Sequence, residues 1–422
     1  MNIALWGYGY YGHDLEAIVA ECWNDRYRIT CILDVRYREL IGSGSVRVED
    51  PDKVETLYRE GVFDAVLIGI YDQQTALQVK SVLDRKDIPV LKLEEQKDYY
   101  APDQFEHLTP DIPFSRNGYE LYLYPELYLC TTPDPEVYFI TDQDGRINDA
   151  YWEGYQKESE PVARFGRPML SFPEIVLPGG WCFLARLYTE NYWHFTFEVL
   201  DKLWLMERSG FIGSYILPHT EAAETYASLL GIRSERILWT KDLERGKTYR
   251  FEKLYCPVPL GEGRVSSAPV LVEAAREIRE HLPPSAGSYP EKIYVKRTGT
   301  RKLRLSQSVL EEYGFVTIVP EEYSIEEQIR FFEHAKVVLS PHGANTSNSL
   351  FMKPGTVLIE TFPLHYSNPC CLETLVLQNI AYLPITELYS PSKTGSGMYS
   401  DYSISRVQFR MAMSIAEKVL NN

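Results

Sequence analysis

The clearest alternation of apolar and polar segments lies between Val337 and Glu360, in the run VVLSPHGANTSNSLFMKPGTVLIE. Two apolar segments of strand length, VVLS and TVLIE, flank a short polar loop, a helical segment and a Lys-Pro-Gly turn. Apolar runs this short, bounded by Pro and Gly, are typical of strands in a parallel sheet that is covered on both faces. The pattern therefore predicts a strand–loop–helix–strand unit.

The loop of this unit carries His342, Gly343, Ala344 and Asn345 where the first strand ends. In open α/β sheets, ligands bind outside the carboxyl ends of the strands, and helix N-termini at that edge favour anions. The small Gly-Ala step allows a phosphate to approach the backbone closely. We therefore expect the diphosphate of a nucleotide above this loop.

The N-terminal 95 residues show a second pattern of this kind, a short apolar strand followed by the loop GYGYYG and an amphipathic helix. The loop contains Gly7, Gly9 and Gly12, and the next strand ends at Asp34, 22 residues after the last glycine. That spacing is typical of dinucleotide-binding folds, in which the acidic residue bonds a ribose. The glycines are equally explained by a tight turn and close helix packing without a ligand. We expect a small Rossmann-like domain over 1–95, with a possible second nucleotide site.

The chain between 96 and 118 is polar, contains several prolines and lacks periodicity, which is typical of a linker. Residues 119–150 are rich in strand-forming residues. Asp142 and Asp144 match the Asp-x-Asp pattern that holds a divalent metal in some glycosyltransferases. Gly145 follows them, so an Asp-Gly hairpin turn is the better interpretation, and we expect no obligatory metal.

A largely apolar helix is expected from about Asn191 to Arg208, and it carries one narrow polar stripe. Asn191, His194, Glu198 and Asp201 fall at i, i+3, i+7 and i+10. A His and a Glu one turn apart can form an acid/base pair in which the carboxylate orients the imidazole ring. The alternative is that His194 and Glu198 form a structural pair that covers a helix end. A metal site is not expected, because no third His or Cys lies nearby.

The segment EKIYVKR is expected to be a strand that delivers Arg297 to the same sheet edge, and the following loop adds Arg301. Fixed cations there can neutralise a leaving diphosphate, although a solvated basic loop would show the same pattern. Glu360 ends the second strand of the opening unit, where a carboxylate can bond the two ribose hydroxyls or simply cap the strand. A terminal helix is expected in 391–422.

Composition narrows the function classes. A chain of 422 residues with 45% hydrophobic content is expected to fold into two or three domains. The net charge of −16, without a long basic run, argues against nucleic acid as a partner. The start lacks the pattern of a signal peptide, and no apolar run approaches the ~18 residues of a membrane helix. With seven scattered cysteines, we expect a cytoplasmic protein, with peripheral membrane contact possible.

The ordered motifs resemble those of glycosyltransferase family 61, over roughly 120–390. The family has an Asn-Tyr-x-His-Phe…Glu helix, a strand ending in Arg, a Gln-Ile pair and a His-Gly-Ala…Asn…Phe-Met-x-Pro-Gly…Glu segment. The matching residues are Asn191, Tyr192, His194, Phe195, Glu198, Arg297, Gln328, Ile329, His342, Gly343, Ala344, Asn348, Phe351, Met352, Pro354, Gly355 and Glu360. Two positions depart from the pattern: Ser306 stands where the family has Asn, and Thr346 where it has Leu. The first leaves open which of Arg301, Lys302 and Arg304 meets the phosphates.

The resemblance implies an α/β fold with a GT-B-like pair of Rossmann-like halves, preceded here by the small Rossmann-like N-terminal domain. The acceptor-side half would span 119–285 and the nucleotide-sugar half 286–390. It also implies inverting, metal-independent transfer from a nucleotide-sugar, UDP most often, to an oligosaccharide or lipid-linked glycan. The family includes bacterial enzymes of capsular polysaccharide synthesis.

On this interpretation each polar residue has an expected role. His194 is the general base and Glu198 orients it, while Asn191 and Asp201 line the acceptor side. The donor is held by Arg297, Arg301, His342, Gly343, Ala344, Asn345, Asn348 and Glu360. Two other functions compete: an NAD- or nucleotide-sugar-dependent oxidoreductase or epimerase acting through the loop Gly7–Gly12, and a non-catalytic glycan-binding scaffold.

Overall fold

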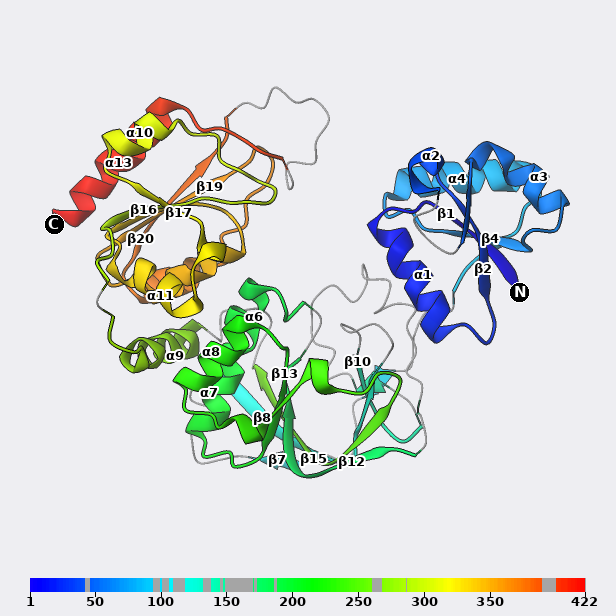
Figure 1. Ribbon diagram of the computed structural model, residues 1–422, viewed down its shortest axis with the longest axis horizontal. Coiled ribbons are helices and arrows are strands. Elements are labelled where there is room, and N and C mark those ends of the chain that lie inside the picture. Colours follow the sequence, from blue (N-terminus) through cyan, green and yellow to red (C-terminus); the bar gives the residue numbers. More distant parts are fainter. Residues whose placement is uncertain are drawn as a thin grey trace. The chain divides into compact units, whose positions relative to one another are not determined.

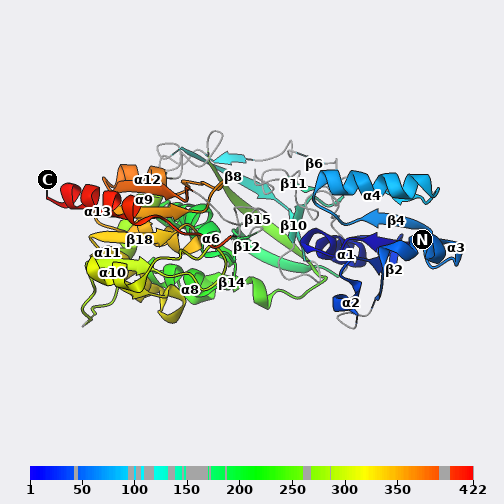
Figure 2. The same cartoon turned by 90° about the horizontal axis from the view of Figure 1, so that it is seen from above.

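The chain divides into two compact units in a computed structural model (Figure 1, Figure 2). Unit 1 comprises Met1–Phe105, Tyr124–Gly179 and Leu243–Leu254, and unit 2 comprises Glu106–Leu123, Gly180–Asp242 and Tyr255–Asn422. The structure describes residues 1–41, 46–93, 99–100, 106–108, 118–131, 138–144, 147–148, 170, 173–185, 188–259, 268–285, 287–388 and 400–421.

Unit 1 begins with a five-stranded parallel sheet in the order β3-β2-β1-β4-β5, the strand order of Rossmann-type folds. Alternate residues of β1 face opposite layers: Ile3 and Leu5 pack with α1, whereas Ala4 packs with α3 and α4. The elements are β1 (Asn2–Trp6), α1 (Tyr10–Cys22), β2 (Arg28–Leu33), α2 (Tyr37–Leu40), β3 (Arg47–Glu49), η1 (Pro51–Lys53), α3 (Val54–Arg59), β4 (Ala65–Ile68), α4 (Gln73–Arg85) and β5 (Val90–Leu91).

The other strands of unit 1 are short and mainly antiparallel. They are β6 (Tyr99–Tyr100), β9 (Tyr128–Thr131), β10 (Tyr138–Thr141), β11 (Ile147–Asn148) and parts of β12 (Ile175–Phe183) and β15 (Thr248–Pro259). Between β10 and β11, which pair antiparallel, Asp142 Oδ1 accepts the Asp144 N–H at 2.9 Å. The predicted turn at this Asp-x-Asp sequence is confirmed, although Gly145 lies outside the described residues.

Unit 2 contains a small parallel sheet in the order β14-β13-β12. Its strands and the helices around it are β13 (Ser214–Leu217), β14 (Ile237–Trp239), α6 (Tyr192–Glu198), α7 (Leu200–Arg208), α8 (Glu221–Leu229), α9 (Ala268–His281) and the short turns η4 (Ser234–Arg236) and η5 (Thr240–Asp242). An antiparallel pair, β7 (Glu106–Leu108) and β8 (Tyr119–Pro125), also belongs in large part to this unit.

The long helix expected from Asn191 to Arg208 is two helices, with a break at Val199, where φ is −121°. In a continuous helix the amide of Lys202 would bond the carbonyl of Glu198. Here the Lys202 ammonium bonds that carbonyl at 2.8 Å, and Asp201 Oδ1 accepts the Lys202 amide at 2.7 Å. The two side chains thus satisfy the backbone groups that the break sets free, which residue periodicity alone did not indicate.

The second sheet of unit 2 has five parallel strands in the order β17-β16-β18-β19-β20. Helices α10 and α13 pack on one face and α11 on the other (Figure 1), where η8 and α12 join the same hydrophobic core. The elements are β16 (Lys292–Val295), α10 (Gln307–Glu312), β17 (Val316–Ile318), η7 (Pro320–Glu322), α11 (Ile325–His334), β18 (Val337–Pro341), η8 (Ala344–Phe351), β19 (Val357–Phe362), α12 (Leu372–Leu377), β20 (Ala381–Thr386) and α13 (Arg406–Leu420). The predicted strand–loop–helix–strand unit is therefore present as β18, η8 and β19.

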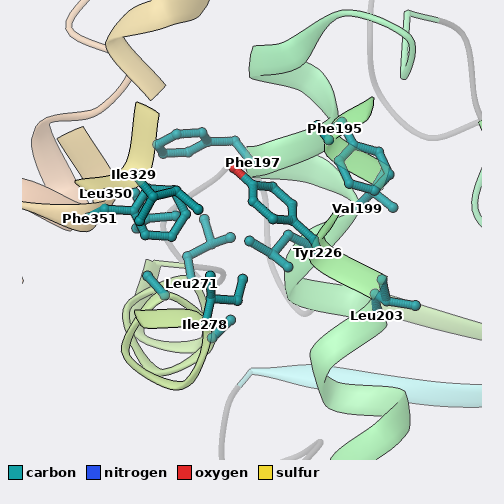
Figure 3. Close-up of a cluster of buried hydrophobic side chains, with 14 of the residues drawn as sticks. Phe195, Phe197, Val199, Leu203, Tyr226, Leu271, Ile278, Ile329, Leu350 and Phe351 are labelled. Atoms are coloured by element: carbon teal, nitrogen blue, oxygen red, sulfur yellow. The ribbon is translucent and has the colours of Figure 1, made fainter. Parts of the chain in front are cut away.

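One hydrophobic core serves both sheets of unit 2. Figure 3 shows Phe197 and Tyr226, from α6 and α8, beside Leu350 and Phe351 from η8, with Leu271 of α9 next to them. The mixed α/β class expected from the sequence is confirmed. The GT-B pairing of two halves, and the domain boundaries at residues 95, 118, 285 and 390, stay predictions.

A buried polar network crosses this core. The Tyr192 hydroxyl donates to Asn348 Oδ1 at 2.6 Å, and Asn348 Nδ2 donates to Gln328 Oε1 at 3.1 Å. Gln328 Nε2 in turn donates to the carbonyls of Pro320 and Tyr323 at 3.0 and 3.1 Å. Asn348 is completely buried, so it holds α6, η8 and α11 together and does not face a ligand, contrary to its expected role in donor binding.

Replacing Asn348 by alanine is therefore expected to lower the free energy of unfolding by about 1–3 kcal/mol, because Tyr192 and Gln328 lose a buried partner. Urea unfolding measures the change. Asn345→Ala is the matched control, since Asn345 is only half-buried and its hydrogen bond to Glu321 Oε1, at 3.1 Å, is exposed. Equal stability of the two variants would contradict a structural role for Asn348.

Candidate functional site

The candidate site lies at the carboxyl ends of β16, β18 and β19 in unit 2. The chain runs from β16 to β17 on one side of it and then to β18 on the other, so the strand order reverses between β16 and β18. Ligands of open α/β sheets bind at such a switch point. Arg297 follows β16 and His342 follows β18, and Arg297 Nη1 donates to the His342 carbonyl at 3.1 Å. The structure thus brings together two residues that the sequence assigned to the donor.

The Arg297 guanidinium packs directly against Gly343. A Cβ at Gly343 would lie 1.3 Å from Arg297 Nη1 and 2.6 Å from its Cζ. The guanidinium is also held by a bond from Nε to the Thr300 carbonyl at 2.8 Å. The sequence explained the glycine by the close approach of a phosphate, whereas in the structure it is a guanidinium that approaches.

Gly343→Ala is expected to displace the Arg297 guanidinium and to weaken nucleotide binding about tenfold, the equivalent of one charged hydrogen bond. Calorimetric titration with nucleoside diphosphates measures the effect. Gly355→Ala is the control for a loss of stability. An added Cβ at Gly355 meets no atom within 4 Å, but its φ of 77° is unfavourable for alanine. Unchanged binding in Gly343→Ala would show that the position of Arg297 is unimportant.

Arg301 is the second cation of the site. Its Cζ lies 5.6 Å from the centre of the Tyr366 ring, and its backbone has φ of 62°, an uncommon conformation for a residue other than glycine. Its Nε is buried without a hydrogen-bond partner in the described structure. Such strain and an unpartnered buried donor are typical of functional sites.

Among the described residues, neither Arg297 nor Arg301 forms an ion pair with a carboxylate. Burial, and next the nearby charge of Arg301, lower the pKa of Arg297 below its ordinary value. An anion bound between the two guanidinium groups would relieve both effects. Arg304, in contrast, lies 3.7 Å from Asp401, and Lys302 is exposed. Of the three basic residues left open by the sequence, Arg301 is thus the one that lies against Tyr366 and near the charge of Arg297.

His342 is almost fully buried and is held from both sides. Its Nδ1 lies 2.7 Å from Glu360 Oε1, the Tyr366 hydroxyl lies 3.4 Å from its Nε2, and Phe362 stacks on the ring. The Tyr382 hydroxyl donates to the other oxygen of Glu360 at 2.7 Å. Burial, and then the charge of Glu360, raise the pKa of Tyr382, so this hydroxyl keeps its proton.

The expected ribose contact of Glu360 does not agree with this geometry. Glu360 is completely buried, and both of its oxygens accept hydrogen bonds from protein groups. Its position instead fixes the orientation of His342, as carboxylates do for imidazoles in many sites.

The predicted pair on α6 is present. His194 Nδ1 lies 2.9 Å from Glu198 Oε2, and the two side chains are 18% and 24% exposed. The rings of Tyr188 and Trp193 pack against His194. If the ring carries its proton on Nδ1, directed at Glu198, then Nε2 is its acceptor nitrogen, which is the tautomer that a general base requires.

Two other residues of the predicted stripe have structural roles. Asn191 is the N-cap of α6, where its side chain accepts the Trp193 N–H at 2.9 Å. Asp201 is 1% exposed and accepts a hydrogen bond from the hydroxyl of Tyr119. The expected place of Asp201 on the acceptor side does not agree with this burial, because the carboxylate is bonded to Tyr119 and to the Lys202 amide in the core.

The N-terminal glycine loop in unit 1 is tightly packed against its own backbone. A Cβ at Gly12 would lie 2.1 Å from the Gly7 carbonyl oxygen, and Gly7 has φ of 95°. Asp34 Oδ2 accepts the Tyr8 N–H at 2.7 Å, and Asp34 Oδ1 accepts bonds from the backbone and side chain of Arg36.

These contacts explain the glycines and Asp34 without a ligand. Burial alone would raise the pKa of Asp34, but the bonds from Arg36 and Tyr8 outweigh it and lower that pKa. At Gly9, an added Cβ meets no atom within 4 Å, so only Gly7 and Gly12 are sterically required. A second nucleotide site here stays a prediction.

The sequence did not indicate Tyr366 or Tyr382. Tyr366 belongs to the loop after β19, and the rule that ligand residues follow strand ends could have drawn attention to it. Tyr382 lies inside β20, beside β19, and nothing in its local sequence distinguishes it from a half-buried strand residue.

Groups of three or more His, Cys, Asp or Glu side chains that could hold a metal ion are absent from the part of the chain that the structure describes. Within that same part, none of the helices has the length and apolar character needed to cross a membrane.

Comparison with known proteins places the site in a family. Residues 192–359 match the family model described as Glycosyltransferase 61. The search of curated proteins finds no match. Among solved structures, the metal-soaked Flv1 flavodiiron core from Synechocystis sp. PCC6803 is matched over 93% of this chain and 80% of that chain, with 12% identity. Its TM-score of 0.21 is too low to carry an argument about the fold.

The matched segment contains His194, Glu198, Arg297, Arg301 and His342, so the motifs recognised in the sequence and the residues gathered in unit 2 coincide with it. This match supports glycosyltransferase activity, with a sugar donor and a glycan acceptor. Residues 192–359 are thus similar to glycosyltransferase family 61.

Proposed function

We propose that the protein is an inverting, metal-independent glycosyltransferase that moves a sugar from a nucleoside-diphosphate sugar to a hydroxyl of a glycan acceptor. The observation that carries the proposal is the pair Arg297 and Arg301 at the switch point of the sheet, two guanidinium groups that have no carboxylate partner among the described residues.

The two arginines suit a leaving diphosphate. Guanidinium groups bind phosphate oxygens with paired hydrogen bonds, and fixed cations stabilise the negative charge that develops as the sugar–phosphate bond breaks. The amides at the start of η8, after His342, would add donors on the same side. These groups take the part that a divalent metal plays in other glycosyltransferases.

His194 is the proposed general base. Its Nε2 takes the proton of the acceptor hydroxyl while that oxygen forms a bond to the anomeric carbon. The bond from this carbon to the diphosphate oxygen breaks, and its electron pair leaves with the nucleoside diphosphate. Attack opposite the leaving group inverts the anomeric configuration. Glu198 stabilises the imidazolium that forms.

The biological setting rests on the resemblance to bacterial capsule enzymes. We propose an oligosaccharide or lipid-linked acceptor in surface polysaccharide synthesis, a UDP-sugar as donor, and a cytoplasmic location with possible contact to the inner face of the membrane.

The test is a panel of UDP-, GDP- and CMP-sugars with oligosaccharide acceptors, in which nucleotide release by the full chain is followed with and without EDTA. We expect acceptor-stimulated release from one donor class that EDTA does not abolish. Binding without turnover across the panel would instead favour a non-catalytic scaffold, and loss of activity in EDTA would contradict metal independence.

A further inference from the structure

The segment that follows the second sheet of unit 2 returns to the loop that carries Arg301. The Tyr402 amide donates to the Lys302 carbonyl at 3.0 Å, and the Arg304 amide donates to the Tyr402 carbonyl at 2.7 Å. Asp401 Oδ1 accepts the Lys302 amide at 2.9 Å. The backbone directly after Arg301 is therefore held on both sides of Leu303, which pairs with Tyr402 in an isolated parallel bridge.

The side chain of Tyr402 extends this contact to the end of β19. It is 2% exposed, and its hydroxyl lies 2.7 Å from both the carbonyl and the Oγ1 of Thr361. Thr361 directly follows Glu360, the residue that holds His342. Burial raises the pKa of Tyr402, so the hydroxyl remains a donor at neutral pH. One tyrosine thus ties the Arg301 loop to the strand that carries the partner of His342.

Arg301 is the residue of the site that most needs such support. Its left-handed backbone is unfavourable for an arginine, and its buried Nε lacks a partner in the described structure. A residue in this state keeps its conformation only when its surroundings determine it. The bonds from Asp401 and Tyr402 act on the next three residues, and together with the bond from Arg297 Nε to the Thr300 carbonyl they supply this constraint.

We propose that Asp401 and Tyr402 are positioning residues of the diphosphate site, which hold the Arg301 guanidinium where the leaving phosphate binds. The inference rests on the proposed function, because it assumes that Arg301 binds the phosphate groups of the donor. Both residues lie outside the family-matched segment 192–359, so the donor site extends into the C-terminal segment of the chain.

Calorimetric titration of the full chain with UDP and with inorganic pyrophosphate tests the inference. The variants are Asp401→Ala, which removes the acceptor for the Lys302 amide, and Tyr402→Phe, which removes only the hydroxyl. Asp401→Asn keeps an acceptor oxygen and is the rescue variant. Ser405→Ala is the matched control, because Ser405 lies in the same segment and its hydrogen bonds are made with Gln408, at the start of α13.

We expect Asp401→Ala and Tyr402→Phe each to weaken binding of both probes about fivefold to tenfold, the effect of one lost hydrogen bond on a positioned charge. Asp401→Asn and Ser405→Ala are expected to bind within about twofold of wild type. In the Arg301→Ala background, Tyr402→Phe is expected to add little, because the two changes act through the same group.

Three results would overturn the inference. The first is binding as tight as that of wild type in Asp401→Ala and Tyr402→Phe while Arg301→Ala binds more weakly. That result would leave the proposed function intact. The second is an equal loss in Ser405→Ala, which indicates a general loss of stability, monitored by thermal unfolding of every variant. The third is absence of binding by wild type to either probe, which would overturn the proposed function as well.

Discussion

His194→Ala is expected to lower kcat for sugar transfer by about 10²- to 10⁴-fold, because an acceptor hydroxyl attacks poorly while it keeps its proton. Donor binding is expected to stay unchanged, since His194 belongs to α6 and the phosphate-binding groups follow β16 and β18. Steady-state kinetics with the identified donor, together with calorimetric titration of the nucleoside diphosphate, separates the two effects.

His219→Ala is the matched control for this prediction. His219 also pairs with a glutamate, with Nε2 2.8 Å from Glu224 Oε1, and it follows β13 in the same unit. It has no proposed role in proton transfer. A His194→Ala enzyme that is as active as His219→Ala would remove the base assignment, and Glu198→Gln should lie between wild type and His194→Ala.

Arg297→Ala is expected to lower kcat by about 10²- to 10³-fold, the usual effect of removing one fixed donor that stabilises transition-state charge. Nucleoside diphosphate binding should weaken as well, because the same guanidinium meets the phosphate in the ground state. Arg297→Lys is expected to restore little, since an ammonium group cannot bridge the Thr300 and His342 carbonyls and still present a planar fork.

Arg276→Ala controls for the loss of a positive charge in unit 2. Arg276 is exposed on α9 and pairs with Glu273, away from the strand ends. An Arg297→Ala enzyme with the kinetics of Arg276→Ala would show that the switch-point arginine does not contact the donor.

The sequence predicted the elements around the site better than the roles of individual side chains. Strand–loop–helix–strand patterns placed His342 and Arg297 at strand ends, because apolar runs and turn residues are local signals. It also predicted the His194–Glu198 pair, since one helical turn separates them. The structural roles of Asn348 and Glu360 were not predictable, because their partners Tyr192 and Tyr382 belong to other elements of the fold.

Two further differences have a physical reason. At the helix break at Val199, the side chains of Asp201 and Lys202 satisfy the freed backbone groups, and helical periodicity does not indicate such bonds. The polar residues of the predicted stripe therefore differ in exposure: His194 and Glu198 are partly exposed, whereas Asp201 is buried. The contact between Tyr402 and the Arg301 loop joins segments about 100 residues apart, and the local sequence of neither segment predicts it.

Both histidines of the site are paired with a glutamate, and the structure separates their tasks by exposure. His194 and Glu198 are partly exposed on α6, while His342, directly after β18, and Glu360 in β19 are buried. The buried pair is therefore suited to holding the loop after β18 in shape, and the partly exposed pair is suited to proton transfer.

The most direct measurement of the central claim is a crystal structure of the full chain with a bound nucleoside diphosphate. The account predicts that the phosphates lie at the carboxyl ends of β16 and β18, within hydrogen-bonding distance of the guanidinium groups of Arg297 and Arg301. A nucleotide bound instead at the loop Gly7–Gly12, or phosphates that contact neither arginine, would contradict it.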